Sequence, residues 1–196
     1  MGSLEFRRQI FHLLLGVAIV FLIKFGAISK NIILAIIVIG LLLSHLIKKK
    51  TKIPIVYQLL RKFERDEELN RFPGRGIIFY FIGIYFVMLL FTKEIVMASI
   101  MVLALGDSIS HLYGLHFGKI KHPLSRTKFL EGTVAGVFAG FIGASAFVPW
   151  HEAFFASLAA MTVEAIEIKI GAEQVNDNLI VPLVVGAVIS ALRFLK

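Results

Sequence analysis

Residues 105–136, LGDSISHLYGLHFGKIKHPLSRTKFLEGTVAG, are the stretch around which the rest of the chain is organised. An apolar segment ends in a turn that carries Asp107, Ser110 and His111. A basic loop punctuated by glycines follows, and a second apolar segment begins at Glu131 and Gly132. The stretch therefore presents charges of both signs at the end of a bundle of apolar segments.

The composition around this stretch is that of a membrane protein. Of the 196 residues, 58% are hydrophobic and only 17% are charged, whereas about 25% of the residues in a typical soluble domain are charged. Apolar runs with short connections continue through the whole sequence, so we expect one integral-membrane domain covering residues 1–196. The chain contains no Cys, which excludes disulfide and thiolate chemistry.

Seven apolar segments approach the roughly 17–25 residues that a helix needs to cross a bilayer. They comprise residues 10–28, 31–47, 76–92, 94–113, 130–149, 152–168 and 178–195. The sixth contains Glu164 and Glu167 and is the least typical span. The sequence therefore predicts an all-α fold, a polytopic transmembrane helical bundle with about seven spans.

The basic residues between these segments predict the orientation. With the N-terminus in the cytoplasm, 16 of the 21 Lys and Arg residues lie on the inside. Cytoplasmic loops are enriched in such residues, so this asymmetry predicts a cytoplasmic N-terminus and places residues 105–136 at the cytoplasmic face. The net charge of +8 then indicates lipid headgroups and phosphate-bearing ligands as partners, and no nucleic acid. A plasma membrane and an endoplasmic reticulum membrane fit equally well, and such a bundle is compatible with an oligomer.

Residues 53–72 are predicted to form an amphipathic helix in the cytoplasmic interface. Leu59, Leu60 and Phe63 alternate there with basic and acidic side chains, as in helices that lie along a membrane surface. A solvated linker helix fits the pattern equally well. Residues 73–76, PGRG, end this segment and start the third span.

Four glycines recur in the fifth segment at mostly four-residue spacing: Gly132, Gly136, Gly140 and Gly143. Small residues on one face let two membrane helices approach closely. We interpret these positions mainly as packing positions. Gly132 is the exception, because it adjoins Glu131 at the membrane surface and is a candidate for ligand contact.

Acidic side chains in and beside the apolar segments predict a metal-assisted site, because a charge at membrane depth costs about 3 kcal/mol and needs a reason. Carboxylates that converge from different helices suit Mg²⁺, which keeps water and phosphate oxygens as its other ligands. For Glu131, an ordinary helix-start residue is the alternative. The candidate Mg²⁺ ligands are Asp107, Glu131, Glu164 and Asp177.

The loop after Asp107 is predicted to bind phosphate. Gly114 and Gly118 let backbone N–H groups approach an anion, while Lys119 and Lys128 supply positive charge. For Lys121 and Arg126, the ordinary enrichment of basic residues in cytoplasmic loops is an alternative explanation that needs no bound phosphate. The other candidate nucleotide-binding residues lie at predicted cytoplasmic helix ends, and they are Arg8, His12, Arg75, Ser110, Gly132 and Asn178.

Two of these groups have ordinary structural alternatives. Arg8 and His12 share one face of the first helix and could bind a phosphate. A histidine that only hydrogen-bonds a neighbouring helix explains His12 equally well. Residues 176–178, NDN, precede the last helix, where any one of them could be the N-cap. Three in a row beside an acidic sixth helix exceed what capping needs.

These side chains favour phosphoryl or nucleotidyl transfer over covalent catalysis. No spacing specifies a Ser-His-acid triad, and the Glu-x-x-His elements of di-iron bundles are missing. Phosphoryl transfer depends on cations, a metal and positioning, which this set provides. A small ion-coupled transporter is the non-enzyme alternative, although the predicted outer loops carry few polar groups to extend an ion path.

Residues 107–132 resemble the CTP-binding motif of the dolichol kinase and polyprenol kinase family, DxxAxxxGxxxG followed by eight residues and KKTxEG. Ser110 replaces the Ala, Thr127 the first Lys and Phe129 the Thr. The matching residues are Asp107, Gly114, Gly118, Lys128, Glu131 and Gly132. Glu5, Arg8 and His12 resemble the family's ExxRKxxH start, with Gln9 in place of Lys, and Glu164 with residues 177–182, DNLIVP, resembles its C-terminal acid and DNLxxP signature.

This resemblance implies a kinase that uses CTP and Mg²⁺ to phosphorylate a long-chain isoprenoid alcohol at the cytoplasmic membrane face. It implies Asp107 as metal ligand or general base, Lys128 as a phosphate clamp, and Glu131 as a further catalytic residue. The membrane kinases of phytol and diacylglycerol share much of the pattern. The CDP-diacylglycerol synthases, which make a CDP-lipid from a lipid phosphate, also carry a GDS turn. They add an HGGxxDRxD signature, and this chain has DNLIVP in that region instead, which favours the kinase.

Overall fold

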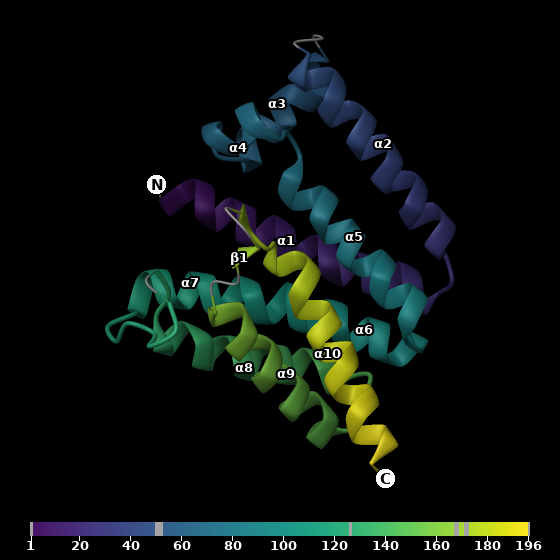
Figure 1. The fold of residues 1–196 in the computed structure, drawn as a ribbon, viewed down its shortest axis with the longest axis vertical. Coiled ribbons are helices and arrows are strands. Elements are labelled where there is room, and N and C mark those ends of the chain that lie inside the picture. Colours follow the sequence, from purple (N-terminus) through teal and green to yellow (C-terminus); the bar gives the residue numbers. More distant parts are fainter. Residues whose placement is uncertain (1, 50–52, 126, 167–168, 171–172, 196) are drawn as a thin grey trace.

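The structure, a computed structural model, describes residues 2–49, 53–125, 127–166, 169–170 and 173–195, and it is dominated by helices (Figure 1). The helices are α1 (Gly2–Lys24), α2 (Lys30–Lys48), α3 (Pro54–Phe63), α4 (Asp66–Arg71), α5 (Arg75–Leu90), α6 (Lys93–Met101), the π-helical η1 (Val102–Asp107), α7 (Ser108–Phe117), α8 (Leu130–Ala144), α9 (Trp150–Ala165) and α10 (Asp177–Phe194). Two short strands, β1 (Lys169–Ile170) and β2 (Glu173–Gln174), form an antiparallel pair before α10.

Helices occupy all seven segments that the apolar pattern predicts, so the all-α expectation is confirmed. Among the described residues, four helices are long and apolar enough to cross a membrane, and these are Leu4–Lys24, Lys30–Lys48, Lys93–Phe117 and Asp177–Phe194. α5 and α8 are shorter apolar helices, and α9 has 16 residues. The count of seven spans and the cytoplasmic N-terminus stay predictions. Glu167, which the sixth predicted segment contains with Glu164, lies outside the described residues.

The predicted surface helix over residues 53–72 is two helices in the structure. α3 ends at Phe63 and α4 begins at Asp66. The chain breaks here because the Glu64 side chain turns inward and accepts a hydrogen bond from the Gly74 N–H at 3.0 Å. Phe63 packs on Phe11 of α1, with ring centroids 4.9 Å apart, which fixes α3 beside the N-terminal helix.

The helices run between two ends of the molecule (Figure 1). At one end the start of α6 meets the end of α1, where the Lys93 ammonium donates to the Lys24 carbonyl at 3.0 Å. At the same end Arg193 of α10 bonds Glu152 of α9 at 2.9 Å. The start of α1, the α3–α4 segment, the loop after α7 and the start of α10 gather at the other end.

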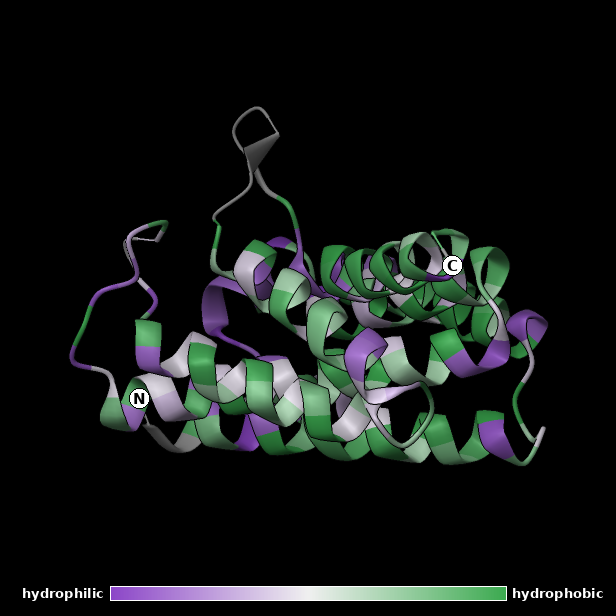
Figure 2. Ribbon diagram, turned by 90° about the horizontal axis from the view of Figure 1, so that it is seen from below, coloured by the Kyte–Doolittle hydropathy of each residue, from purple (hydrophilic) through white to green (hydrophobic). Residues whose placement is uncertain are grey.

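Gly136, Gly140 and Gly143 of α8 are packing positions, as their spacing predicts, and Gly132, predicted as a candidate for ligand contact, is buried with them. All four are buried where α8 lies between α9 and the η1–α7 helix. A Cβ at Gly136 would lie 2.7 Å from the Ser110 Cβ, and one at Gly143 would lie 2.6 Å from a Leu105 methyl. Figure 2 shows hydrophobic residues along the lengths of the helices and hydrophilic residues mainly near their ends, as expected for a membrane bundle.

Candidate active site

A polar cavity of about 320 Å³ opens at the end of the bundle where α1, α4, α5, α7 and α10 meet. Its walls come from segments that are far apart in the sequence, and most of the lining side chains are charged or carry amides. The predicted site residues that line it are Arg8, Arg75, Asp107, Lys128, Glu164, Asp177 and Asn178. The structure therefore brings together the N-terminal, central and C-terminal groups of predicted residues.

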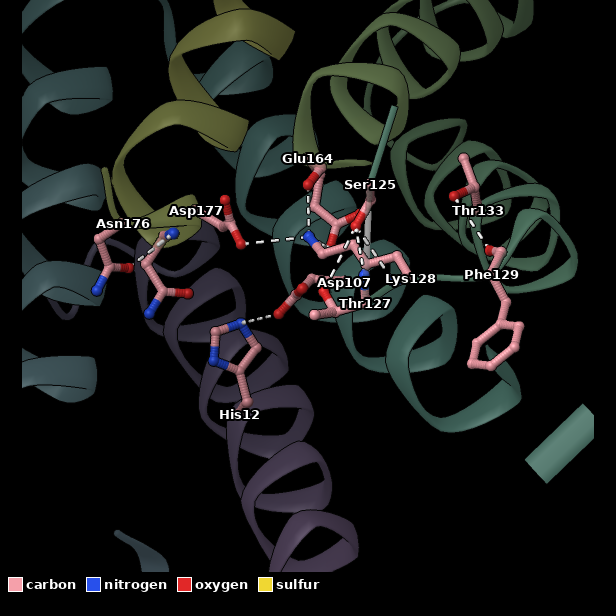
Figure 3. A network of polar contacts seen from close by, with 11 residues as sticks. His12, Asp107, Ser125, Thr127, Lys128, Phe129, Thr133, Glu164, Asn176 and Asp177 are labelled. Atoms are coloured by element: carbon pink, nitrogen blue, oxygen red, sulfur yellow. Dashed lines mark hydrogen bonds and ion pairs between the residues drawn. The ribbon is translucent and has the colours of Figure 1, made fainter. Parts of the chain in front are cut away.

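Lys128 is the central cation of this cavity (Figure 3). Its ammonium lies 2.5 Å from the Glu164 carboxylate and 3.4 Å from the Asp177 carboxylate, and it also donates to the Glu164 carbonyl. Glu164 is only 4% exposed, whereas Asp177 is 32% exposed. Lys128 therefore connects a buried acid on α9 with an accessible acid at the start of α10.

The environment of Lys128 keeps its side chain protonated. Burial disfavours the ammonium, but the neighbouring carboxylates of Glu164 and Asp177 outweigh this and raise the pKa of Lys128. A raised lysine pKa means a full positive charge at neutral pH. Lys128 is therefore suited to binding an anion and unsuited to accepting a proton.

Asp107 occupies the last position of the π-helical segment η1. A π turn holds one more residue than an α turn and occurs often at functional sites. This turn sets Asp107 opposite α1, where its carboxylate lies 3.7 Å from His12 Nε2 (Figure 3). That distance is too long for a hydrogen bond, so a small movement or a bound ligand can bridge the two groups.

A second, smaller cavity of about 120 Å³ adjoins the first and shares Arg8, Asp107 and Asn178 with it. His12 and Tyr80 line this cavity, with ring centroids 4.5 Å apart. The His12 Nε2 and the Tyr80 hydroxyl are both buried without a hydrogen-bond partner. Buried polar groups are normally satisfied, so these atoms point to a ligand or water between the α1 and α5 helices.

Glu5 organises the rim of the larger cavity. Its carboxylate pairs with Arg65 at 2.7 Å, Arg8 at 3.2 Å and His111 at 3.3 Å. Arg8 also reaches Glu68 of α4 at 3.7 Å. These contacts tie the start of α1 to α4 and α7, and they hold the Arg8 guanidinium over the cavity.

The start of α10 combines a cap with two functional candidates. Asn176 is the N-cap, and its side chain accepts a hydrogen bond from the Asn178 N–H at 3.0 Å. The Asn178 side chain donates to the Gly76 carbonyl at 3.1 Å and so joins α10 to α5. Asn176 therefore caps α10, and the Asp177 carboxylate pairs with Lys128.

Six predicted site residues do not line either cavity. Glu131 accepts hydrogen bonds from the backbone N–H groups of Lys119 and Ile120 at 3.2 and 3.1 Å. Gly114 and Gly132 let α7 and α8 approach each other, and Gly118 faces the Phe129 ring. The Lys119 side chain is exposed on the loop. In this structure the group supports the loop that carries Lys128, and Ser110 is buried against α8.

Carboxylates suited to Mg²⁺ remain at the cavity. Glu164 has one oxygen, Oε2, that is buried without a hydrogen-bond partner, and Asp107 and Asp177 line the same cavity. No group of three His, Asp or Glu within the described ranges is close enough to hold a metal alone. One or two carboxylates with substrate phosphates are the usual Mg²⁺ environment, so Asp107, Glu164 and Asp177 fit that role, and the position of Glu131 does not.

Several cavity residues were not singled out as site residues from the sequence. Arg65 and Glu68 come from the surface segment, where a pattern of mixed charge gave no sign that they turn toward α1. Tyr80 lies in an apolar span, and no sequence feature distinguishes it there from an aromatic residue of the core. Glu5 was named in one motif with Arg8, and His111 in one turn with Asp107, but neither was predicted as a site residue, although each pair shares a helical face.

Comparison with known proteins identifies relatives along the chain. It is 33% identical over 193 residues to uncharacterized protein MJ1137 of Methanocaldococcus jannaschii, covering 95% of this chain and 93% of that protein. It is 27% identical over 146 residues to a probable chloroplastic phytol kinase of Triticum aestivum, covering 66% of this chain and 46% of that one. It is 24% identical over 142 residues to CTP-dependent diacylglycerol kinase 1 of Saccharomyces cerevisiae, covering 70% and 48%.

The extent of these matches differs. Matching regions span about half the length of the two named kinases. No family model matches the chain, and no solved structure matches it. The match to the archaeal protein covers nearly the whole of both chains, so this chain belongs to the same family as MJ1137 and is similar in sequence to phytol kinases and CTP-dependent diacylglycerol kinases.

Proposed function

We propose that this protein is a CTP-dependent lipid kinase that transfers the γ-phosphate of CTP to the hydroxyl group of a long-chain isoprenoid alcohol, of the polyprenol or dolichol type, at the cytoplasmic membrane face. The observation that carries the proposal is the cavity in which Asp107, Lys128, Glu164 and Asp177 meet at one end of a bundle of apolar helices. The printed names of the similar proteins support it, because they describe kinases of phytol and diacylglycerol and name CTP.

The proposed reaction is a direct displacement at phosphorus. The lipid hydroxyl oxygen forms a bond to the γ-phosphorus, the bond from that phosphorus to the β–γ bridging oxygen breaks, and CDP leaves with the electron pair. The hydroxyl proton passes to the Asp107 carboxylate, which lies in both cavities. General-base catalysis of this kind contributes about 10²- to 10⁴-fold in rate.

The cations at the cavity match the charge that moves in this reaction. Lys128, Arg8 and Arg75 line it from the α7–α8 loop, α1 and α5 respectively. Negative charge spreads over the phosphate oxygens during transfer, and preorganised cations stabilise it more strongly in a partly dry site than in water. Lys128 is protonated throughout the neutral pH range and is the proposed phosphate clamp.

Mg²⁺ would be held by one or two of the carboxylates of Asp107, Glu164 and Asp177 together with the phosphates of CTP, whose charge it would neutralise. Glu131 is proposed to act indirectly. Its hydrogen bonds to the loop N–H groups hold the segment between α7 and α8, which in turn places Lys128. The acceptor is proposed to be isoprenoid because the residues of the central motif resemble those of dolichol and polyprenol kinases.

Transfer from labelled CTP tests the proposal. Purified protein in detergent or liposomes should move the γ-phosphate of CTP to a polyprenol in preference to phytol and diacylglycerol. Asp107→Asn, which keeps the side-chain shape, should lower the rate by about 100-fold or more, while Asp66→Asn on the exposed surface of α4 should not.

The products separate the alternatives. If CTP and a lipid phosphate give a CDP-lipid and pyrophosphate, the protein is a cytidylyltransferase and the kinase proposal fails. Ion flux in liposomes without nucleotide would instead support a transporter. Transfer to diacylglycerol alone would retain the kinase and overturn the isoprenoid acceptor.

A further inference from the structure

A third and larger cavity, of about 690 Å³, lies between α2, α4 and α5. Ligand sites in proteins have volumes of roughly 300–1,000 Å³, so its size is that of a binding site. Its α2 wall consists of Leu41, Ser44, His45 and Lys48. Its opposite wall consists of Glu67, Glu68, Arg71, Phe72, Arg75 and Phe79. We call this cavity the α2–α5 groove.

The α2 wall is one continuous face of the helix. Its four residues are spaced at i, i+3, i+4 and i+7, which places them above one another on a helix. The seam that packs α2 onto α5 includes Ile33, Ile37 and Ser44. Ile47 is buried as well, so the buried positions of α2 continue beside the groove, and Ser44 belongs to both.

The groove changes from apolar to basic along its length. Leu41 and Lys48 are seven residues apart, a rise of about 10 Å along α2. On the α5 side, Phe79 lies one turn beyond Arg75, whose guanidinium is 5.8 Å from the Phe79 ring centroid. Cations thus line the end near the connections, and apolar side chains line the part that enters the bundle. This is the profile of a site for a molecule with a polar head and an apolar chain.

The groove also shares a wall with the proposed reaction cavity. Arg75 and Glu68 line both spaces, and Glu68 is held on the cavity side by Arg8 at 3.7 Å. A head group that lies beside Arg75 in the groove is therefore in contact with a side chain that also lines the cavity containing Asp107. α2 itself packs mainly on α5 and stands at the edge of the bundle (Figure 1).

We propose that the α2–α5 groove is the binding and entry site for the acceptor lipid alcohol. The chain of the lipid lies along Leu41 and Phe79 with its remainder in the bilayer beside α2, and the hydroxyl reaches the reaction cavity past Arg75 and Glu68. This inference rests on the proposed kinase function, because the acceptor is the lipid that such a kinase needs.

A nucleotide is a poorer occupant of this groove. The cations Lys48, Arg71 and Arg75 are accompanied there by Glu67 and Glu68. The three carboxylates that fit Mg²⁺, the metal that accompanies a nucleotide polyphosphate, line the cavity around Lys128 and not the groove, whereas a neutral hydroxyl in the groove can donate a hydrogen bond to Glu67 or Glu68. The groove is therefore assigned to the alcohol, and the cavity around Lys128 to the nucleotide.

A cysteine placed in the groove tests this assignment after the protein has folded. The chain has no Cys, so Leu41→Cys can be purified, shown to be active, and then modified with a maleimide. Leu42→Cys is the matched control, because Leu42 is the next residue on α2, is 59% exposed and does not line the groove. Modification at position 41 should raise the KM for the lipid alcohol at least fivefold and leave the KM for CTP unchanged, while modification at position 42 should change neither.

A binding measurement without catalysis separates this inference from the proposed function. A polyprenol analogue with a diazirine group should crosslink to α2 and α5 around Leu41 and Phe79, and unlabelled polyprenol should suppress the crosslink. If the wild-type protein phosphorylates polyprenol but the analogue maps elsewhere, the groove assignment is overturned and the kinase stands. If CTP protects Leu41→Cys from the maleimide, the groove holds nucleotide and the assignment is overturned. Crosslinking at the groove without any phosphoryl transfer would retain the lipid site and overturn the kinase.

Discussion

At the scale of single residues, the pairing of Lys128 with Glu164 is the interaction with most influence on both stability and function. Glu164 is 4% exposed, and Lys128 is the cation within bonding distance of its carboxylate. An ion removed from water is costly unless a partner compensates it. The buried carboxylate of Glu164 therefore holds the positive charge of Lys128 in place at the cavity.

Removing the lysine alone should destabilise the protein. Lys128→Met leaves Glu164 buried without a partner, and we expect the free energy of unfolding to fall by about 3–5 kcal/mol. In the double variant with Glu164→Gln the buried charge is gone, so most of this loss should be recovered, but phosphoryl transfer should remain absent in both. Thermal unfolding in detergent measures the first effect, and Lys62→Met, at an exposed lysine of α3, is the control. Equal stability of the single and double variants would show that the buried Glu164 carboxylate does not need Lys128 as its charge partner.

At the scale of elements, the close packing of α8 on η1 decides where Asp107 lies. A Cβ at Gly136 would lie 2.7 Å from the Ser110 Cβ and 2.8 Å from the Gly106 carbonyl oxygen. Gly136→Ala should therefore separate the helices and lower the free energy of unfolding by about 1–3 kcal/mol. Val134→Ile also adds one methyl group to α8, but at a position that is 49% exposed. That variant should unfold at the wild-type temperature, and an equal loss in both would contradict the packing role of the glycine.

The turn between α3 and α4 should make stability depend on pH through Glu64. Burial raises the pKa of Glu64, and the hydrogen bond from the Gly74 N–H offsets only part of this. A carboxyl whose pKa is higher in the folded state binds its proton more tightly there, so its contribution to stability is present at low pH and is lost as the pH rises from the unfolded value near 4.5 through the folded pKa.

Glu64→Gln should remove this dependence while keeping an acceptor for the Gly74 N–H. The difference in unfolding temperature between the variant and the wild type should therefore shift in favour of the variant as the pH rises above 4.5. Unfolding scans at a series of pH values measure it, with Glu67→Gln on the exposed face of α4 as the control. A difference that stays constant with pH would rule out Glu64 as the responsible group.

At the scale of the whole molecule, the two ends of the bundle predict which connections share a side of the membrane. The α1–α2 connection and the start of α4 lie at opposite ends (Figure 1). Because the chain has no Cys, Ala27→Cys and Asp66→Cys each introduce one thiol. With the N-terminus in the cytoplasm, an impermeant maleimide should label position 27 in intact cells and position 66 only after permeabilisation. The reverse pattern would place the proposed site on the outer side.

Much of the site could be located from the sequence, because hydropathy and charge at helix ends are local properties. Arg8, Asp107, Lys128, Glu164 and Asp177 were all predicted as one site, and the structure places them around one cavity. The position of the Glu131 side chain could not be predicted from such local properties. Whether its carboxylate faces a ligand or the backbone of its own loop depends on how that loop folds back over α8.

The sequence by itself determined that the chain forms apolar helices and that its charged residues concentrate at the helix ends, since both follow from residue types and their spacing along the chain. Only the tertiary structure decided that a π turn carries Asp107 to His12, that Lys128 pairs with Glu164, 36 residues further along the chain, and that a groove beside α2 meets the same cavity. These features depend on the rotation of each helix about its axis and on how closely neighbours pack. A pattern read along one helix does not contain that information.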